Sequence, residues 1–324
     1  MSQPRVVVIG GGTGSFTLLT GIKNWTKNVT AIVNMSDDGG SSGELRDELG
    51  VLPPGDVRQC LVALSNNPAA RDMFSYRFGN GKLNGHAVGN IILSALELQT
   101  GSFSKAVKIV ADFMGITGQV LPVSNQNHVL VMVDGNELIE GEQKVSHHKI
   151  QHPEAQLKLK PKALLNPQAK VAISNADLVV IAPGDLYGSI LPTLIVTGMS
   201  SALKNTKARV VMIANLINKP NQTKGWHVID YLNQVERYIG KGSIDALIFN
   251  TQVPSKSLLN KYSRKGEFPV DIDEHKFSST KLKLVGANLL SPYIFKQDPN
   301  DKAIKRTLIR HNPEAVTSLL RRLV

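Results

Sequence analysis

The chain has 324 residues, of which 42% are hydrophobic and 19% charged, fractions that are ordinary for a folded globular protein. Its single cysteine, Cys60, excludes an internal disulfide and a cysteine-rich zinc site and favours a reducing compartment. No apolar run approaches the roughly 18 residues that a membrane-spanning helix needs. Because Met1–Arg5 lead directly into the first predicted strand, the sequence leaves no room for a signal peptide and predicts a cytoplasmic protein.

The net charge of +11 is concentrated late in the chain. Residues 1–100 contain eight Lys or Arg and eight Asp or Glu, whereas the basic C-terminal segment, residues 255–324, contains fourteen and seven. No zinc-finger, RNP or basic-zipper signature accompanies this charge, and aromatic residues are only 5% of the chain, which argues against nucleic acid as a partner. The charge instead favours a phosphorylated small molecule.

The first predicted element is a buried strand, Val6–Ile9, which leads into a glycine-rich turn and the start of a helix. The turn consists of Gly10, Gly11, Gly12, Thr13 and Gly14. Unpaired N–H groups at a helix N-terminus attract an anion, and glycines let it approach the backbone, so the turn is predicted to seat a phosphate. The alternative is a tight turn that needs glycine for geometry only. The dinucleotide fingerprint is only partly matched, because Ser15 stands at its third glycine position.

A second apolar run, Ala31–Val33, follows one helix later and leads into Asp37 and Asp38. In a parallel βαβ unit these carboxylates would emerge beside the first turn, so that phosphate donors and paired carboxylates share one crevice. The alternative is a solvated turn, because Asp and Gly are typical turn residues.

Several helix starts are predicted in the next part of the chain. Asp56 is placed to cap a helix over residues 57–64, in which Cys60 is expected to be buried and inert. At a later helix start, glycines flank His86 and Asn90 and leave both room to face a ligand, although a lone histidine there is more often structural. Three Asn-Pro pairs, at 67–68, 166–167 and 312–313, also predict helix starts.

In residues 119–160 the pattern changes from alternating strands and helices to short strands, which indicates a small antiparallel segment inserted in an α/β fold. Residues 129–133 and 138–139 predict a hairpin with Asp134-Gly135 as its turn, and residues 156–160 alternate with period two, as a half-exposed strand does. His147, His148 and His152 lie between these strands. Adjacent histidines on a strand point to opposite faces, and no third ligand appears at a telling spacing, so the pattern argues against a metal site.

The α/β pattern then resumes with a buried strand over residues 177–182 and the loop that begins Pro183, Gly184, Asp185. Further strands are predicted over 209–214, which ends at Asn215, and over 246–249 and 281–285. Ligands of parallel sheets bind at the carboxyl ends of the strands, so this second glycine loop is expected at the same edge as the first. The predicted fold is a Rossmann-like α/β class with a doubly wound, mostly parallel sheet and helices on both faces, forming one nucleotide-binding domain over 1–324.

Six motifs together resemble a known family. They are Gly10–Gly14, Ser36–Gly43, Pro53–Arg58, Gly85–Asn90, Ala182–Tyr187 and Arg310–Asn312. Their order resembles that of the gluconeogenesis factor (YvcK-like) family, which is similar in fold to the 2-phospho-L-lactate transferases (CofD-like). The resemblance implies a cytoplasmic factor that binds UDP-N-acetylglucosamine and acts in cell shape and envelope synthesis during gluconeogenic growth, with no established catalysis. It also implies protein partners in envelope synthesis, and the sequence leaves a homo-oligomer open.

By motif, the resemblance assigns site residues to this chain. The glycine turn and Asn215 would line the nucleotide pocket, Asp37 and Asp38 would lie near the diphosphate or a metal ion, and Arg310 would meet the ligand's negative charge. The full set of candidate ligand-binding residues is Gly10, Gly11, Gly12, Thr13, Gly14, Asp37, Asp38, Asn90, Pro183, Gly184, Asp185, Asn215 and Arg310.

The chain also departs from the family pattern. Asp185 stands where the family has serine, and in the loop after Asn215 the sequence has Gln222 in place of an acidic residue and adds Lys219. A sugar or metal contact by that loop is therefore not carried over. Asn312 replaces an aspartate but can still cap a helix.

Two other functions stay open from the sequence. One is a magnesium-dependent transferase of the phospho-lactyl type, in which Asp37 and Asp38 hold Mg²⁺ between two phosphates. The other is an NAD(P)-binding protein, although Asn34 stands where a ribose-binding carboxylate is expected and no residue set for hydride transfer is visible.

Overall fold

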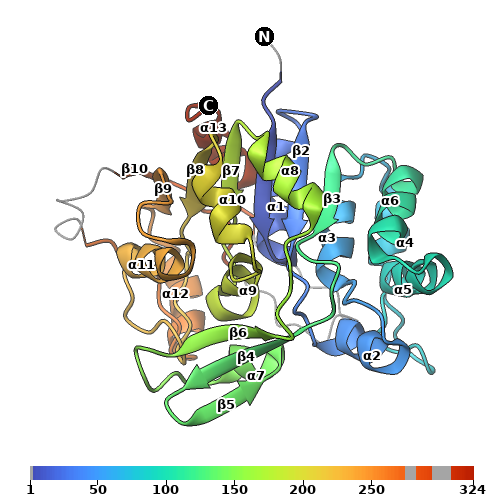
Figure 1. Cartoon of the computed structure of the whole chain (residues 1–324). Helices are drawn as coiled ribbons and strands as arrows, with labels where there is room; N and C mark the ends of the chain where they lie inside the picture. The colour runs from blue at the N-terminus through green and yellow to red at the C-terminus, as the bar shows by residue number, and fades with distance from the viewer. Residues whose placement is uncertain (1–2, 274–281, 294–307) are drawn as a thin grey trace.

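The computed structural model describes residues 3–273, 282–293 and 308–324. Its centre is a seven-stranded sheet whose neighbouring strands all pair in parallel (Figure 1). In spatial order the strands are β10 (Lys283–Ala287), β9 (Ala246–Asn250), β8 (Arg209–Ile213), β7 (Leu178–Ile181), β1 (Val6–Gly10), β2 (Val29–Val33) and β3 (Gln119–Pro122).

The direction in which strands are added reverses between β1 and β7. From β1 the chain builds toward one edge through β2 and β3; β7 then lies on the other side of β1, and β8, β9 and β10 follow outward from it. Val8 in β1 therefore pairs with Ala31 on one side and with Val180 on the other. Such a switch point is where open α/β sheets leave a crevice outside the carboxyl ends of their strands.

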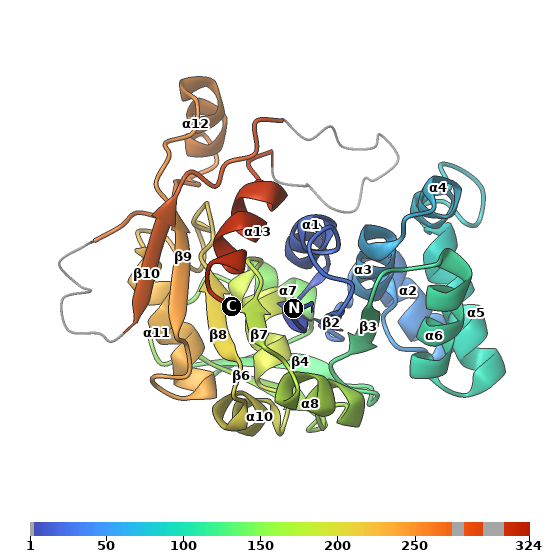
Figure 2. The same cartoon turned by 90° about the horizontal axis from the view of Figure 1, so that it is seen from above.

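Helices cover both faces of the sheet, which confirms the predicted doubly wound α/β class. In Figure 2, α1, α3 and α13 lie on one face and α8, α10 and α11 on the other. Because both faces are covered, Val6–Ile9 are at most 2% exposed, as a continuous apolar run predicts. The helices are α1 (Gly12–Ile22), α2 (Gly40–Leu49), α3 (Gly55–Leu64), α4 (Pro68–Ser75), α5 (Val88–Thr100), α6 (Phe103–Met114), α7 (Glu142–His147), α8 (Pro167–Ser174), the π-helix η1 (Leu186–Ile190), α9 (Leu191–Leu194), α10 (Met199–Asn205), α11 (Val228–Ile239), α12 (Lys256–Ser263) and α13 (Pro313–Arg321).

The three Asn-Pro pairs start helices as predicted. The side chain of Asn67 accepts a hydrogen bond from an amide in the first turn of α4, and Asn166 and Asn312 do the same for α8 and α13. The cap predicted at Asp56 is wrong, because α3 begins at Gly55, two residues before the predicted start, with Pro54 at the capping position. Asp56 therefore lies within the first turn, and its carboxylate is available for another contact.

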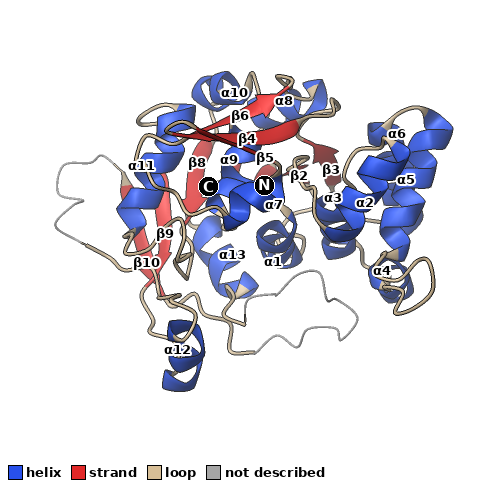
Figure 3. Cartoon of the chain, turned by 90° about the horizontal axis from the view of Figure 1, so that it is seen from below, coloured by secondary structure: helices blue, strands red, loops and turns tan. Residues whose placement is uncertain are grey.

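The inserted segment forms a separate three-stranded antiparallel sheet in the order β5 (Glu137–Glu140), β4 (Val129–Asp134), β6 (Gln156–Lys160). It begins later than the pattern suggests: residues 119–122 form β3, which pairs in parallel with β2. The hairpin turn is also shifted by one residue, since Asp134 pairs with Glu137 and leaves Gly135, at a φ of +59°, and Asn136 as the loop. Figure 3 shows this sheet and α7 lying across the carboxyl ends of the main strands.

The last strand of the main sheet is also displaced from its predicted position. The sequence places it over 281–285, whereas β10 runs over Lys283–Ala287 and Lys281 lies outside the described residues. Parts of the basic segment 255–324 likewise lie outside them. Within the described ranges, none of the helices combines the length and the apolar character needed to cross a bilayer.

Candidate functional site

Two glycine loops meet at the switch point of the sheet. A Cβ atom at Gly14, in the first turn of α1, would overlap the carbonyl oxygen of Pro183 in the loop after β7. A Cβ atom at Gly11 would lie 2.8 Å from the Cβ atom of Ser189. These close approaches explain the glycines by packing, and they bring the two predicted loops to one edge of the sheet.

The first turn of α1 also faces α3. The backbone N–H of Gly12 donates a hydrogen bond to the carboxylate of Asp56, and Thr13 Oγ1 lies 3.4 Å from Gln59 Oε1. Asp56 thus places a carboxylate against an amide of the predicted phosphate seat. Sequence reasoning missed this role, because Asp56 was assigned to a helix cap.

Asp56 and Asp37 form a carboxyl pair beside this turn. Burial and the neighbouring Asp37 raise the pKa of Asp56 to about 7, and burial likewise raises the pKa of Asp37. Asp37 Oδ1 also accepts a hydrogen bond of 3.0 Å from the N–H of Gly39, at the start of α2. Two like charges in one low-dielectric place disfavour each other, so the pair retains a proton more readily than isolated carboxyls do.

Asp38 has a different position from Asp37. Its two carboxylate oxygens accept hydrogen bonds of 2.8 Å from the N–H groups of Glu142 and Gln143, which are the first residues of α7. The carboxylate therefore lies at the positive end of this short helix and attaches the inserted segment to the main domain.

Replacing Asp38 with alanine is expected to cost about 1–2 kcal/mol of unfolding free energy, as loss of a capping side chain does. Hydrogen exchange should rise first at the amides of Glu142 and Gln143. The matched control is Asp72→Ala, which removes an exposed carboxylate from α4 and should change neither property. Equal exchange at α7 in both variants would contradict the capping role.

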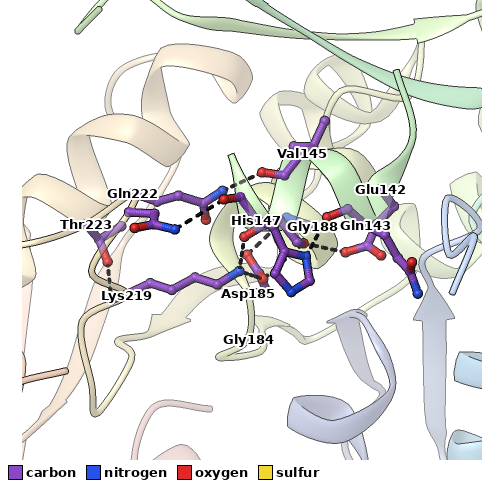
Figure 4. A network of polar contacts seen from close by, with 12 residues as sticks. Glu142, Gln143, Val145, His147, Gly184, Asp185, Gly188, Lys219, Gln222 and Thr223 are labelled. Atoms are coloured by element: carbon purple, nitrogen blue, oxygen red, sulfur yellow. Dashed lines mark hydrogen bonds and ion pairs between the residues drawn. The ribbon is translucent and has the colours of Figure 1, made fainter. Parts of the chain in front are cut away.

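Glu142 belongs to a polar network between α7 and the loop after β7 (Figure 4). The hydroxyl of Ser146 donates to Glu142 Oε1 over 2.5 Å and approaches Asp185 Oδ2 at 3.2 Å. Burial first, and then the charges of Asp37, Asp185 and Asp38, raise the pKa of Glu142 to about 8. Glu142 is therefore predominantly protonated at neutral pH.

The loop between β8 and α11 closes this network from the other side. Lys219 Nζ forms an ion pair with Asp185 and donates a hydrogen bond of 2.7 Å to the carbonyl oxygen of Ser146, and Gln222 Nε2 donates to the carbonyl oxygen of Val145 over 2.7 Å. Figure 4 shows both side chains reaching α7 from this loop. The residues that depart from the family pattern, Lys219, Gln222 and Asp185, thus hold α7 in place.

Asn215 and the segment around Arg310 meet at the end of β8. Asn215 donates to the carbonyl oxygen of Gly184 over 2.7 Å and accepts from its N–H at 3.2 Å, which fixes the second glycine loop. Arg310 is next to His311, whose ring nitrogen Nε2 contacts the carbonyl oxygen of Ala214 at 3.2 Å. Burial lowers the pKa of His311 to about 4, so this ring is neutral and acts as a structural donor.

Asn90 supports the site indirectly. Its Nδ2 donates to the hydroxyl of Ser41, in the first turn of α2, over 3.0 Å, while its Oδ1 accepts from Arg58 Nε at 2.8 Å. His86 contacts the same serine through Nδ1 at 3.1 Å. These residues position the helix that follows Asp37 and Asp38.

The three central histidines do not lie as the sequence analysis assumed. His147 ends helix α7, so the argument from opposite faces of a strand is wrong. His148 and His152 both contact Asp134, at 2.8 Å each. Burial would raise the pKa of Asp134, but hydrogen bonds from Gln151 and the two histidines lower it to about 2. Across 3–273, 282–293 and 308–324, no three His, Cys, Asp or Glu side chains are grouped to hold a metal ion.

The comparisons with known proteins cover nearly the whole chain. Residues 6–290 match the family model described as 2-phospho-L-lactate transferase CofD. The chain is 37% identical over 332 residues to the gluconeogenesis factor of Halalkalibacterium halodurans, covering 99% of this chain and 96% of the relative. It is 34% identical over 328 residues to the gluconeogenesis factor of Bacillus subtilis, covering 98% and 97%.

A solved structure shows the same architecture. The X-ray crystal structure of a protein from Bacillus halodurans superposes with a TM-score of 0.89 at 34% identity, covering 99% of this chain and all of that chain. The predicted resemblance is therefore confirmed: this chain belongs to the CofD family, within the branch of the gluconeogenesis factors.

Proposed function

We propose that the protein is a regulatory gluconeogenesis factor that binds UDP-N-acetylglucosamine at the switch point between β1 and β7. The observation that carries this proposal is the meeting of two glycine loops and the N-terminus of α1 at one edge of the sheet. The names of its relatives support the regulatory role. In this proposal the protein acts in the cytoplasm and links carbon supply to cell shape and envelope synthesis through protein partners, with a homo-oligomer as one arrangement.

The carboxylates around the loops bear on how a diphosphate is accommodated. The carboxylate of Asp56 accepts a hydrogen bond from the N–H of Gly12. A diphosphate that binds this N–H must displace the carboxylate, or bind beside it when Asp56 is protonated. Asn215 and Lys219 follow β8, and the segment that carries Arg310 reaches the end of β8 through His311, so in this proposal Arg310 and Lys219 supply the cationic groups for the diphosphate. The ligand would thus bridge elements that are distant in the sequence.

Calorimetric titration with UDP-N-acetylglucosamine tests the proposal. The wild-type protein is expected to bind, and Arg310→Ala to bind at least about tenfold more weakly, because a charge-assisted contact to phosphate is lost. Arg5→Ala is the matched control. It removes the same charge from an exposed side chain that directly precedes β1, at the amino ends of the strands and away from the proposed site. Absence of heat with wild type, or equal affinity in Arg310→Ala, would refute the proposed site.

The match to the transferase family favours one second candidate, a magnesium-dependent transfer of a phosphorus-containing group. Mg²⁺ is usually held by one or two carboxylates together with substrate phosphates. Both oxygens of Asp38 accept hydrogen bonds from α7 amides, whereas Asp37 and Asp56 are close enough for the charge of one to raise the pKa of the other, and they are the pair that would hold the ion. Magnesium there would neutralise phosphate charge.

Incubation with a guanosine phospho-lactyl donor, a deazaflavin acceptor and Mg²⁺ tests this second candidate. Product formation supports the transferase function, and absence of product contradicts it.

A further inference from the structure

A cavity lies where the inserted sheet joins the main domain, away from the two glycine loops. It has a volume of about 370 Å³ and is lined by α2, the start of β4 and the end of β6. Figure 1 shows β4 and β6 converging beside α2 at this junction. We call it the junction cavity. Its lining residues are Arg46, Asp47, Asn127, His128, Val129, Lys160 and Pro161.

The polar groups of the junction cavity are mainly hydrogen-bond donors. The side chain of Arg46 is only 13% exposed, and its guanidinium bonds the neighbouring Asp47, which is 70% exposed, at 3.0 and 3.1 Å. Lys160 is 71% exposed and pairs with Glu140 at 3.2 Å. The carboxylates of Asp47 and Glu140 are exposed and can leave their cations for water, so that either cation can take a ligand in their place. With His128 neutral, the lining carries a net positive charge.

His128 connects this cavity to the loop that carries Asp37. It is 2% exposed, and its Nδ1 lies 2.9 Å from the carbonyl oxygen of Gln126, which can only accept, so Nδ1 carries the proton. Nε2 then accepts from the hydroxyl of Ser36 over 3.1 Å. Burial lowers the pKa of His128, and the charge of Arg46 lowers it further. Ser36 directly precedes Asp37, so this hydrogen bond joins the cavity wall to that loop.

We propose that the junction cavity binds a small organic anion with a phosphate or carboxylate head, and that this binding adjusts the Asp37 loop through the contact between His128 and Ser36. The guanidinium of Arg46 provides the planar pair of donors that such heads accept, and Lys160 and Asn127 provide further donors. The volume is at the small end of the range for metabolite sites. This site is separate from the proposed nucleotide-sugar site and does not depend on it.

Titration of the full chain with three probes, in the absence of any nucleotide, tests the binding. The probes are glycerol 3-phosphate, succinate and inorganic phosphate. At least one of the two organic anions is expected to bind with a Kd of about 1 mM or below. Arg46→Gln should weaken that binding at least tenfold and Lys160→Gln several-fold, while Arg322→Gln, at the exposed end of α13, should leave it unchanged. Because Lys160 is exposed, its variant tests the site even where Arg46→Gln folds poorly.

Three outcomes would overturn the proposal: binding of neither organic anion, binding of inorganic phosphate alone, or equal affinity in Arg46→Gln, Lys160→Gln and the control. The coupling is tested by hydrogen exchange over residues 37–43 with and without the bound anion. The wild type is expected to show a changed exchange rate there, and Ser36→Ala should bind the anion but lose that change, because it removes the hydroxyl that joins His128 to the loop. An unchanged exchange response in Ser36→Ala would contradict the proposed route.

Discussion

Replacing Gly14 with alanine is expected to lower the free energy of unfolding by about 3 kcal/mol or more. The added Cβ atom would overlap the carbonyl oxygen of Pro183, and neither backbone can rotate out of the way as a side chain does. Relief requires α1 to separate from the loop after β7, which opens the switch point of the sheet. A urea unfolding curve and a fall in Tm of roughly 5 °C or more would register the change.

The matched control for this prediction is Gly184→Ala in the same junction. Its new Cβ atom would lie 3.1 Å from Ile190 Cδ1, the flexible end of a side chain that can move aside. We expect a loss below about 1 kcal/mol. A Gly14→Ala protein as stable as Gly184→Ala would show that the two loops are not packed as described.

Replacing Glu142 with glutamine is expected to stabilise the protein at pH 8.5 and to leave its stability near pH 5 unchanged. Burial raises the pKa of Glu142 from 4.5 in the unfolded chain to about 8 in the folded protein. Between these values the folded state holds a proton that the unfolded state releases, so the unfolding free energy falls as the pH rises through this window. Glutamine resembles the protonated acid, so the variant avoids this loss, on the order of 2–4 kcal/mol.

Urea unfolding at pH 5, 6, 7 and 8.5 measures this difference. Glu137→Gln, an exposed position on β5 close to Glu142 in the sequence, is the control and should match wild type throughout. The unfolding free energy of Glu142→Gln will still fall somewhat as the pH rises. Asp56 and Glu97 cause this remaining fall, because their pKa values are raised to about 7 and about 6. A stability gain that is equal at all four pH values would contradict the assignment of the raised pKa to Glu142.

Local patterns in the sequence predicted several elements at their observed positions. Continuous apolar runs identified β1 and β7 because a sheet covered on both faces has no polar side. The Asn-Pro pairs identified the starts of α4, α8 and α13 because the capping bond joins residues two or three apart. The alternation in Gln156–Lys160 identified β6 because only one of its faces is buried.

Roles that depend on distant residues were not predictable in the same way. Asp38 lies 104 residues before Glu142, whose amide it accepts, and Lys219 lies 34 residues after Asp185. No pattern along the chain marks such pairs, because the partner is chosen by how the inserted segment folds back over the sheet. Asp56 illustrates the same limit: its sequence position suggests a cap, and only the approach of α1 to α3 gives its carboxylate the Gly12 amide instead.

The sequence by itself determined the α/β class, most of the strands, several helix starts and the family, since these follow from periodicity, capping and motifs within short stretches of chain. The tertiary structure decided which carboxyl groups have raised pKa values, which residues hold α7 and where the junction cavity lies. The physical reason is that pKa shifts and cavities arise from burial and from charges brought together across the fold, and both depend on contacts that only the folded chain makes.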